Sequence, residues 1–521
     1  MRIARPLVFA LNGTLLVVLM LATVACSITI GGGGQPTPTS APQATTPPTC
    51  GPSASTPNPI ATENQCPGTD EWRANQPLGE QHAIEGFVVP ATVNIGGSVR
   101  LYVSTTAASY SFRVYRLGWY QGYGARLMYI SPKYLGKAQP APSIDADTRM
   151  VSAANWTDPA DFSVPATWTS GIYIVKMTSA DGFIRYAPLV VRNDKAKAPI
   201  LIVSSLFTYQ AYNTWGGHSL YAGLDAQGKI TAAARSYEVS FDRPYSDNGG
   251  LMDLALYEYN FVRWFERNGF YGSYAADTDI HLNSQEPLNH QLVIFAGHDE
   301  YWSTAMHDNV VAARDSGVSL AFMTANNSYW HVRVEDSPFG AGRQVICYKD
   351  DLLDPYDKIN SREVTVRFRD EPLYAPERGL IGQQYHGIAS ATAPLILAAG
   401  ASPYLEGTTL TPGTSLPGLV GGEYDQIDPG GARPDNAEIL ASSTVGCQKS
   451  PLCPANGKDT TTAILYTGPH NAKIFSAGTF FWVRGLDDDQ MIASAPAHVV
   501  SSPQFQLFTQ NLIRFLIRKK L

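Results

Sequence analysis

The alternation of hydrophobic and polar positions is strongest between residues 69 and 194. Short runs such as SVRLYVST and GIYIVKMTS alternate apolar and polar side chains, and turn residues separate the runs. A period of two places one side of a strand toward a core and the other toward solvent. The pattern therefore predicts an antiparallel β-sandwich, which we assign to residues 69–195 as an immunoglobulin-like domain.

From residue 196 the pattern changes to continuous apolar segments separated by helical ones. The segment ILIVSS at 200–205 predicts a strand buried on both faces. Strands at 291–296 and 318–324 alternate with helices at about 252–268 and 303–315, and a last helix spans 503–518. This order predicts crossovers and a parallel sheet. The expected fold class of residues 196–521 is α/β, a parallel sheet with flanking helices, and the Gly- and Pro-rich segment 335–460 receives no assignment.

Residues 1–26 predict an export signal. Basic residues precede an apolar stretch, and small residues lead to Cys26. This order resembles a bacterial lipoprotein signal, in which the cysteine carries a lipid anchor; an uncleaved anchor or soluble secretion are the alternatives. Residues 27–68 are rich in Pro, Thr, Ser and Gly and predict an extended tether, because they cannot bury enough apolar area to fold. We expect an exported cell-surface lipoprotein or another membrane-anchored extracytoplasmic protein.

The cysteine spacing fits an oxidising compartment. Of six cysteines, Cys50 and Cys66 are expected to close a loop in the tether, and Cys447 and Cys453 a second, short loop. Cys347 is left unpaired. None of the spacings is CxxC, so a cysteine-ligated zinc site is not expected.

Composition narrows the classes of function. The formal net charge is -7 and basic residues do not cluster with aromatic ones, so nucleic acid is not an expected partner. Charged residues make up only 16% of the chain, whereas tyrosine occurs 27 times. Such an excess of tyrosine fits an extracellular surface, a sugar-binding face or phenolate chemistry. The segment YRLGWYQGYGARLM fits either a carbohydrate- or partner-binding loop or a hairpin packed on the next domain.

Polar side chains follow the predicted strands at their carboxyl ends, where parallel sheets bind ligands. LFTYQAYNTWGGHSLY follows ILIVSS, HDEYW follows QLVIFAG, and NNSY follows SLAFMTA. We find no nucleophile elbow, HExxH motif, P-loop or GxGxxG sequence after a strand. The phenol, carboxylate and amide oxygens of these strand ends suit a hard, Lewis-acidic metal ion.

Several motifs together resemble the large (beta) subunit of N,N-dimethylformamidase and its relatives. They are YQAYNTWGGHSLY, SFDRPY at 240–245, GHDEYWS at 297–303 and the following ANN; RVYRLGWYQGYGARL is similar to the domain before the catalytic part in that family. The resemblance covers roughly residues 85–521. It implies a β-sandwich followed by a glutamine-amidotransferase-like α/β domain, and a mononuclear iron held by two tyrosines and one glutamate.

Carried over by motif, the resemblance implies that Tyr212, Tyr245 and Glu300 are the metal ligands. Tyr209 and Tyr221 flank the first motif and are the alternatives for the tyrosines. Two phenolates and a carboxylate carry three negative charges, which favour Fe(III) over a divalent ion.

Three further residues are expected to act around the iron. His298, two residues before the glutamate, would be a base, and Asn326 would contact the substrate amide or a water. Either His298 or Asp299 would move protons to the leaving amine. Helix capping or a contact with Arg243 is an equal alternative for Asp299.

The expected function is hydrolysis of a C–N amide bond by an exported enzyme that activates water at a mononuclear iron. Export fits a polymer-borne amide better than a small-molecule one, and homo-oligomerisation is left open. The alternative is a non-catalytic cell-surface lipoprotein that binds carbohydrate or another partner and carries a degenerate α/β domain.

Overall fold

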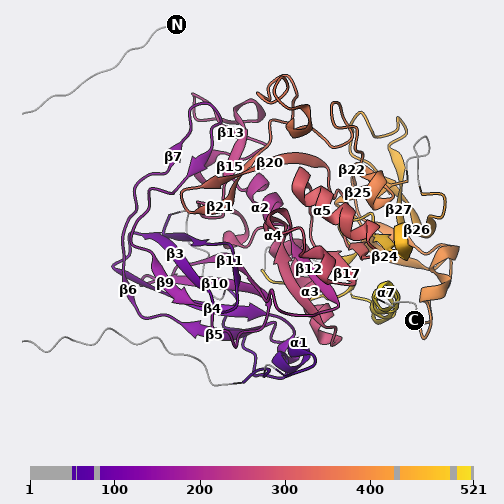
Figure 1. The fold of residues 1–521 in the computed structure, drawn as a ribbon, viewed down its shortest axis with the longest axis horizontal. Helices are drawn as coiled ribbons and strands as arrows, with labels where there is room; N and C mark the ends of the chain where they lie inside the picture. Colours follow the sequence, from indigo (N-terminus) through magenta and orange to yellow (C-terminus); the bar gives the residue numbers. More distant parts are fainter. Residues whose placement is uncertain (1–49, 54, 75–81, 428–433, 493–500, 518–521) are drawn as a thin grey trace, which may run out of the picture. The chain divides into compact units, whose positions relative to one another are not determined.

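The computed structural model describes residues 50–53, 55–74, 82–427, 434–492 and 501–517 (Figure 1). The predicted export signal with Cys26, and the predicted tether up to residue 49, lie outside the described residues. The described residues belong to one compact unit. Within the described ranges, no helix has both the length and the apolar character needed to cross a membrane.

Two larger sheets make up most of the first part of this unit. The alternating pattern that predicted strands here is confirmed, because Val99 and Leu101 of one sheet and Val175 and Leu189 of the other share a hydrophobic core. Most pairings are antiparallel, but β2 and β11 pair in parallel. One sheet has the order β1 (Ile84–Val89), β3 (Ser98–Thr105), β9 (Ala160–Ser163); the other has the order β2 (Thr92–Asn94), β11 (Ile184–Arg192), β10 (Gly171–Ser179), β4 (Ser109–Leu117), β5 (Ala125–Ile130), with β6 (Tyr134–Leu135) beside β4.

A seven-stranded sheet forms the centre of the second part. Its first five strands pair in parallel, as the sequence predicted for the strands near 200, 291 and 318, and the last two pairings are antiparallel. In order across the sheet the strands are β16 (Gly272–Ala276), β12 (Ile200–Ser204), β17 (Leu292–Phe295), β19 (Ser319–Phe322), β28 (Lys473–Ser476), β27 (Lys458–Thr467) and β26 (Glu438–Gly446).

The longer helices begin and end close to their predicted positions. Ser303 caps the helix that follows β17, because its hydroxyl accepts the backbone N–H of Met306. The helix expected from residue 252 starts with a π-helical turn, η5 (Leu254–Glu258), and continues as α3. The helices are α1 (Pro59–Glu63), α2 (Leu206–Tyr212), α3 (Tyr259–Arg267), α4 (Asp277–Leu282), α5 (Thr304–Asp315), α6 (Arg378–Ile381) and α7 (Pro503–Leu516).

The predicted α/β fold class is wrong. Strands account for 34% of the structure and helices for 21%, and the strands of the described part form eight sheets. The molecule is a β-rich multisheet fold and not a glutamine-amidotransferase-like parallel sheet with flanking helices. The segment 335–460, which the hydrophobic pattern left unassigned, supplies many of the extra strands, because its Gly and Pro residues favour turns between short strands over helices.

The additional sheets are small. A four-stranded sheet lies beside the carboxyl ends of the central strands, and four two-stranded sheets complete the set. The four-stranded sheet has the order β15 (Glu238–Ser240), β21 (Gly340–Ile346), β20 (Trp330–Ser337), β18 (Tyr301–Ser303); the pairs are β7 (Ser143–Ile144) with β8 (Val151–Ser152), β13 (Gly223–Leu224) with β14 (Ile230–Thr231), β22 (Gln384–Ile388) with β25 (Glu423–Gln426), and β23 (Ala393–Ile396) with β24 (Ser415–Val420).

The described end of the predicted tether is folded. Both predicted disulfides are confirmed, Cys50–Cys66 and Cys447–Cys453, and Cys347 is a free, buried thiol. The loop closed by the first disulfide contains α1, whose Asn58 side chain accepts the N–H of Ala61 at the helix N-terminus.

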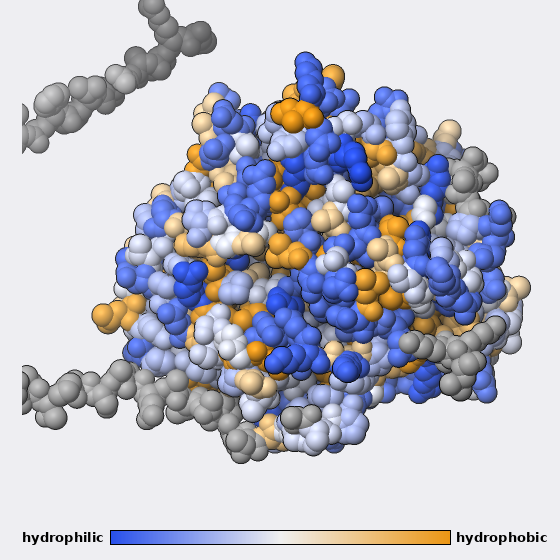
Figure 2. All heavy atoms as spheres, viewed as in Figure 1, coloured by the Kyte–Doolittle hydropathy of each residue, from blue (hydrophilic) through white to orange (hydrophobic). Residues whose placement is uncertain are grey.

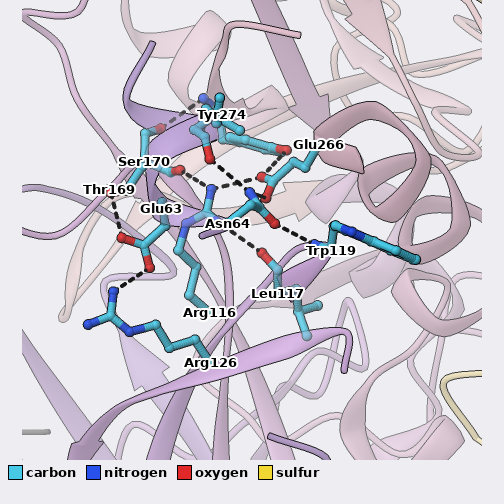
Figure 3. A network of polar contacts seen from close by, with 12 residues as sticks. Glu63, Asn64, Arg116, Leu117, Trp119, Arg126, Thr169, Ser170, Glu266 and Tyr274 are labelled. Atoms are coloured by element: carbon cyan, nitrogen blue, oxygen red, sulfur yellow. Dashed lines mark hydrogen bonds and ion pairs between the residues drawn. The ribbon is translucent and has the colours of Figure 1, made fainter. Parts of the chain in front are cut away.

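A buried polar network, shown in Figure 3, fastens this loop to both parts of the unit. Glu63 accepts from Arg126 at 2.8 Å, and Asn64 donates to Glu266 of α3 at 2.7 Å. Glu266 also pairs with Arg116 of β4 at 2.8 Å, and both side chains are fully buried. The loop therefore covers an ion pair that joins the first sheets to the second part.

Figure 2 shows one face of the molecule, where hydrophilic residues predominate and hydrophobic ones occur in small groups. The most exposed large hydrophobic side chains include Leu135, Leu352 and Ile359. Scattered exposure of this kind is normal and does not by itself mark an interface.

Candidate active site

Two phenols and one carboxylate meet at the edge of the central sheet. The hydroxyl of Tyr212 lies 2.8 Å from Oε2 of Glu300. The hydroxyl of Tyr221 lies 3.0 and 2.9 Å from the two carboxylate oxygens of Glu300, and 2.9 Å from the hydroxyl of Tyr212. Glu300 is 3% exposed, whereas both tyrosines are half-buried. We call these three residues the oxygen cluster.

Parallel pairing explains why Tyr212 and Glu300 meet. Tyr212 ends α2, which follows β12, and Glu300 follows β17. These strands are neighbours in parallel register, so their carboxyl ends lie at one edge of the sheet. A hydrogen bond from the backbone N–H of Glu300 to the hydroxyl of Thr208, at 3.0 Å, fixes the loop to α2.

Arg243 of the SFDRPY motif holds the loop that carries Tyr221. Its buried guanidinium donates to four backbone carbonyls between residues 210 and 218, at 2.9–3.2 Å. These bonds fix the path of the chain from the end of α2 toward Tyr221. The motif therefore contributes to the cluster through its arginine.

A second set of polar side chains adjoins the oxygen cluster. Nε2 of His298 lies 3.6 Å from Oε2 of Glu300 and 3.6 Å from Oε2 of Glu423, and Nδ1 lies 3.7 Å from Asp253. Nδ2 of Asn326 donates to Glu423 at 2.6 Å. The ring of His298 also packs on that of Phe480, with centroids 4.6 Å apart. His298 thus lies among three carboxylates, those of Glu300, Glu423 and Asp253.

The electrostatic environment favours a cationic His298. Burial alone would lower the pKa of His298, but the contact with Asp253 and the charges of Glu423 and Glu300 outweigh it and raise the pKa to about 9. Burial raises the pKa of Glu423 to about 7, although His298 opposes the shift. Burial and the charge of Glu300 raise the pKa of Tyr212 and Tyr221 well above the usual range. Both phenols therefore keep their protons and donate them to Glu300 in hydrogen bonds.

Two of the predicted site residues, Tyr245 and Asp299, are not part of the oxygen cluster. Tyr245 is buried, and its ring packs edge-on against Tyr209 with centroids 6.4 Å apart. Within the described residues, Tyr245 makes no hydrogen bond to the oxygen cluster. Asp299 is fully buried, neither carboxylate oxygen has a hydrogen-bond partner among the described residues, and burial raises its pKa well above the usual range.

Sequence reasoning did not single out Glu423, Asp253 or Lys349. Glu423 starts β25 inside the segment 335–460, where no strand was predicted. Asp253 precedes η5 and Lys349 follows β21. None of these three residues belongs to a motif or follows a predicted parallel strand, so no local signal pointed to them.

The oxygen cluster fits a hard metal ion. The part of the chain that the structure describes has no group of three or more His, Cys, Asp or Glu side chains placed to hold a metal. The cluster instead joins one carboxylate to two phenols, and its oxygens lie 2.8–2.9 Å apart. Neighbouring oxygen ligands about 2.0–2.1 Å from one octahedral ion are separated by about 2.9 Å. The three oxygens therefore have the spacing of ligands to a single ion.

Two solved structures show weak likenesses to this chain. A chitin binding domain from Burkholderia pseudomallei is 17% identical, with 28% of this chain and 81% of that chain covered and a TM-score of 0.13. A cycloisomaltooligosaccharide glucanotransferase from Paenibacillus sp., complexed with cycloisomaltoheptaose, is 9% identical, with 69% and 59% covered and a TM-score of 0.17. Neither likeness supports a conclusion about fold or function. Among curated proteins nothing matches.

The sequence comparison with protein families gives a clear result. Residues 111–495 match the family described as N,N-dimethylformamidase beta subunit-like, C-terminal. The match includes the whole oxygen cluster together with His298, Asn326 and Glu423, and it spans well over half of the chain. The relationship is thus to a hydrolase of the N,N-dimethylformamidase kind, and the chain belongs to the N,N-dimethylformamidase beta subunit-like family.

Proposed function

We propose that this protein hydrolyses the C–N bond of an amide at one iron ion held by Tyr212, Tyr221 and Glu300. The spacing of the three cluster oxygens is the observation that supports the proposal most directly. Family membership supports the reaction class. A bound Fe(III) would act as a Lewis acid that polarises the amide carbonyl and lowers the pKa of a water.

The residues beside the cluster suit the proton transfers of this reaction. Water adds to the carbonyl carbon, the C–N bond breaks, and one proton must pass from the water to the amine nitrogen. Oε2 of Glu423 is the acceptor we assign to that proton, since Nδ2 of Asn326 holds it in place at 2.6 Å. Cationic His298, between Glu300 and Glu423, would stabilise negative charge on both sides.

The experiment compares iron binding and amide hydrolysis in single variants of the full chain, purified in detergent. Tyr212→Phe, Tyr221→Phe and Glu300→Gln each remove one cluster oxygen donor or its charge. We expect the wild-type protein to bind iron close to stoichiometrically, with a visible tyrosinate-to-iron absorption band. Each variant should lose the band and at least about 100-fold in amine release from N,N-dimethylformamide or a larger N-alkyl amide.

Tyr245→Phe is the matched control, because it removes a buried phenol outside the cluster. It should keep iron, colour and activity. Loss of the band in Tyr245→Phe with retention in Tyr221→Phe would contradict the ligand assignment. A wild-type protein that takes up no iron and releases no amine would overturn the proposal and favour a non-catalytic binding protein.

A further inference from the structure

Lys349 lies against the oxygen cluster in a cage of aromatic rings. Its Nζ is 3.3 Å from the ring centroid of Tyr221, 4.9 Å from that of Trp330 and 5.3 Å from that of Tyr301. Nζ also donates to the hydroxyl of Tyr301 at 2.8 Å. No carboxylate of the described residues forms a salt bridge with Lys349. The ammonium group is therefore held by rings and one phenol.

The backbone at Lys349 is also unusual. Its φ is 60°, in the left-handed region that long side chains rarely adopt. The N–H of Lys349 donates to the carbonyl of Thr365 at 2.9 Å, which holds this conformation. A disfavoured backbone persists only where the surrounding structure holds it in place, and such residues cluster at functional sites. The side chain that leaves this position lies over the face of Tyr221.

A cation over the face of a ring is attracted by its π-electrons, and the attraction is effective within about 6 Å. All three rings lie within this limit. Nζ of Lys349 is closest to the centroid of Tyr221, and the centroids of Trp330 and Tyr301 are farther away. The attraction increases with the electron density of the ring, and a metal-bound tyrosinate is richer in electrons than a phenol. The contact therefore acts on Tyr221 more strongly than on any other residue of the cluster.

We infer that Lys349 is a positioning residue of the active site: it fixes the ring of Tyr221 and reduces the electron donation of that ring to the metal. The inference rests on the proposed function and adds to it a residue outside the ligand set. Lys349 would act through Tyr221, since its only polar contacts with side chains in the described chain are with aromatic residues. Its positive charge would lower the energy of the electrons that Tyr221 shares with iron.

The test is the absorption band of the iron-loaded full chain, with iron content measured in parallel. Lys349→Met keeps an unbranched chain among the rings but removes the charge, so the band should move to longer wavelength at equal iron content. Lys349→Arg restores the charge and should return the band toward its original position. Lys176→Met is the matched control, because Lys176 is a buried lysine whose Nζ also has uncharged partners; its band should not move.

A second variant carries the test if Lys349→Met does not fold. Tyr301→Phe removes only the hydroxyl that accepts from Nζ and should shift the band less, in the same direction. The inference would be overturned if Lys349→Met bound normal iron and its band did not shift. If Lys349→Met does not fold, the same result in Tyr301→Phe would overturn it. Neither result would contradict the proposed iron site. A wild-type protein without iron would overturn both.

Discussion

At the scale of single residues, the candidate chemistry depends on which charged side chains are buried next to one another. Glu300, Glu423 and Asp253 surround His298, and their combined charge outweighs the burial that would otherwise keep the imidazole neutral. Asn326 adopts a left-handed backbone with φ 54°, which asparagine tolerates better than most residues. This conformation lets its backbone N–H donate to Asp425 at 2.8 Å while its side chain donates to Glu423. Asn326 thus fixes the position of the Glu423 carboxylate while its own backbone is bound to Asp425.

The assigned role of Glu423 predicts the effect of Glu423→Gln. Glutamine can still accept from Asn326 but cannot take up a proton, so kcat/KM for amide hydrolysis should fall about 10²–10⁴-fold. Iron content and the absorption band should stay unchanged, because Glu423 is not in the oxygen cluster. Both are measured on the full chain beside Glu406→Gln, which changes an exposed glutamate. Activity above half of wild type in Glu423→Gln would contradict the role.

At the scale of elements, local patterns predicted the existence of strands and helices better than their pairing. The run ILIVSS became β12, and Ser303 caps α5 as its position before the helix indicated. These outcomes depend on a few neighbouring residues, through side-chain periodicity and a capping hydroxyl. The π-helical turn before α3 and the four-stranded sheet around β20 were not predicted, because both depend on contacts with distant parts of the chain.

One such long-range contact is made by His331, which connects β20 to α5 and to the loop at Val364. His331 lies in β20, is fully buried, and its Nδ1 donates to the carbonyl of Val364 at 2.8 Å. Its Nε2 accepts from the hydroxyl of Thr304, the first residue of α5, at 2.7 Å. A neutral imidazole therefore has a partner at each ring nitrogen. A second proton, on Nε2, would find only the hydroxyl of Thr304 as an acceptor.

His331 predicts a loss of stability in acid. Burial lowers the pKa of His331 to about 4, whereas the unfolded chain has a histidine pKa of about 6.5. Between these values the unfolded state binds more protons, so the free energy of unfolding falls as the pH drops, by about 3 kcal/mol over the whole window. His331→Gln should be less stable at pH 7 but less sensitive to acid between pH 6.5 and 4, as measured by urea unfolding. Parallel pH curves for the two proteins would show that His331 does not titrate in this way.

At the scale of the whole molecule, one hydrophobic cluster extends from the first sheets into the central sheet. It includes Ile172 and Tyr186 from the first part together with Leu201 and Phe295 from the second. The buried pair Arg116–Glu266 crosses the same boundary, and the loop closed by Cys50–Cys66 covers it. A segment with the composition of a tether thereby becomes part of the fold.

Removal of that disulfide should destabilise the protein. In the Cys50→Ser/Cys66→Ser variant the unfolded chain gains the entropy of a loop with a sequence separation of 16, worth about 3 kcal/mol. Release of α1 would also uncover Arg116 and Glu266. The matched variant Cys447→Ser/Cys453→Ser opens a loop with a separation of only 6 and should cost less. Urea unfolding of the oxidised proteins compares the two, and equal losses would show that the loop does not stabilise the pair.

The sequence by itself determined the parts of the site that follow parallel strands. Tyr212, Glu300 and Asn326 come after successive buried strands, and such strand ends must share one edge of a sheet. Cysteine spacing likewise predicted both disulfides. These features depend on periodicity and short-range order, which a sequence records directly.

Only the tertiary structure decided which tyrosine lies beside Glu300. Tyr221 and Tyr245 both belong to recognisable motifs, but four carbonyl contacts of Arg243 direct the loop so that Tyr221 reaches the carboxylate. Glu423 and Lys349 arrive from antiparallel strands and loops that no periodic pattern announced. Their positions depend on the packing of residues far apart in the chain, and neither local propensity nor hydrophobic spacing contains that information.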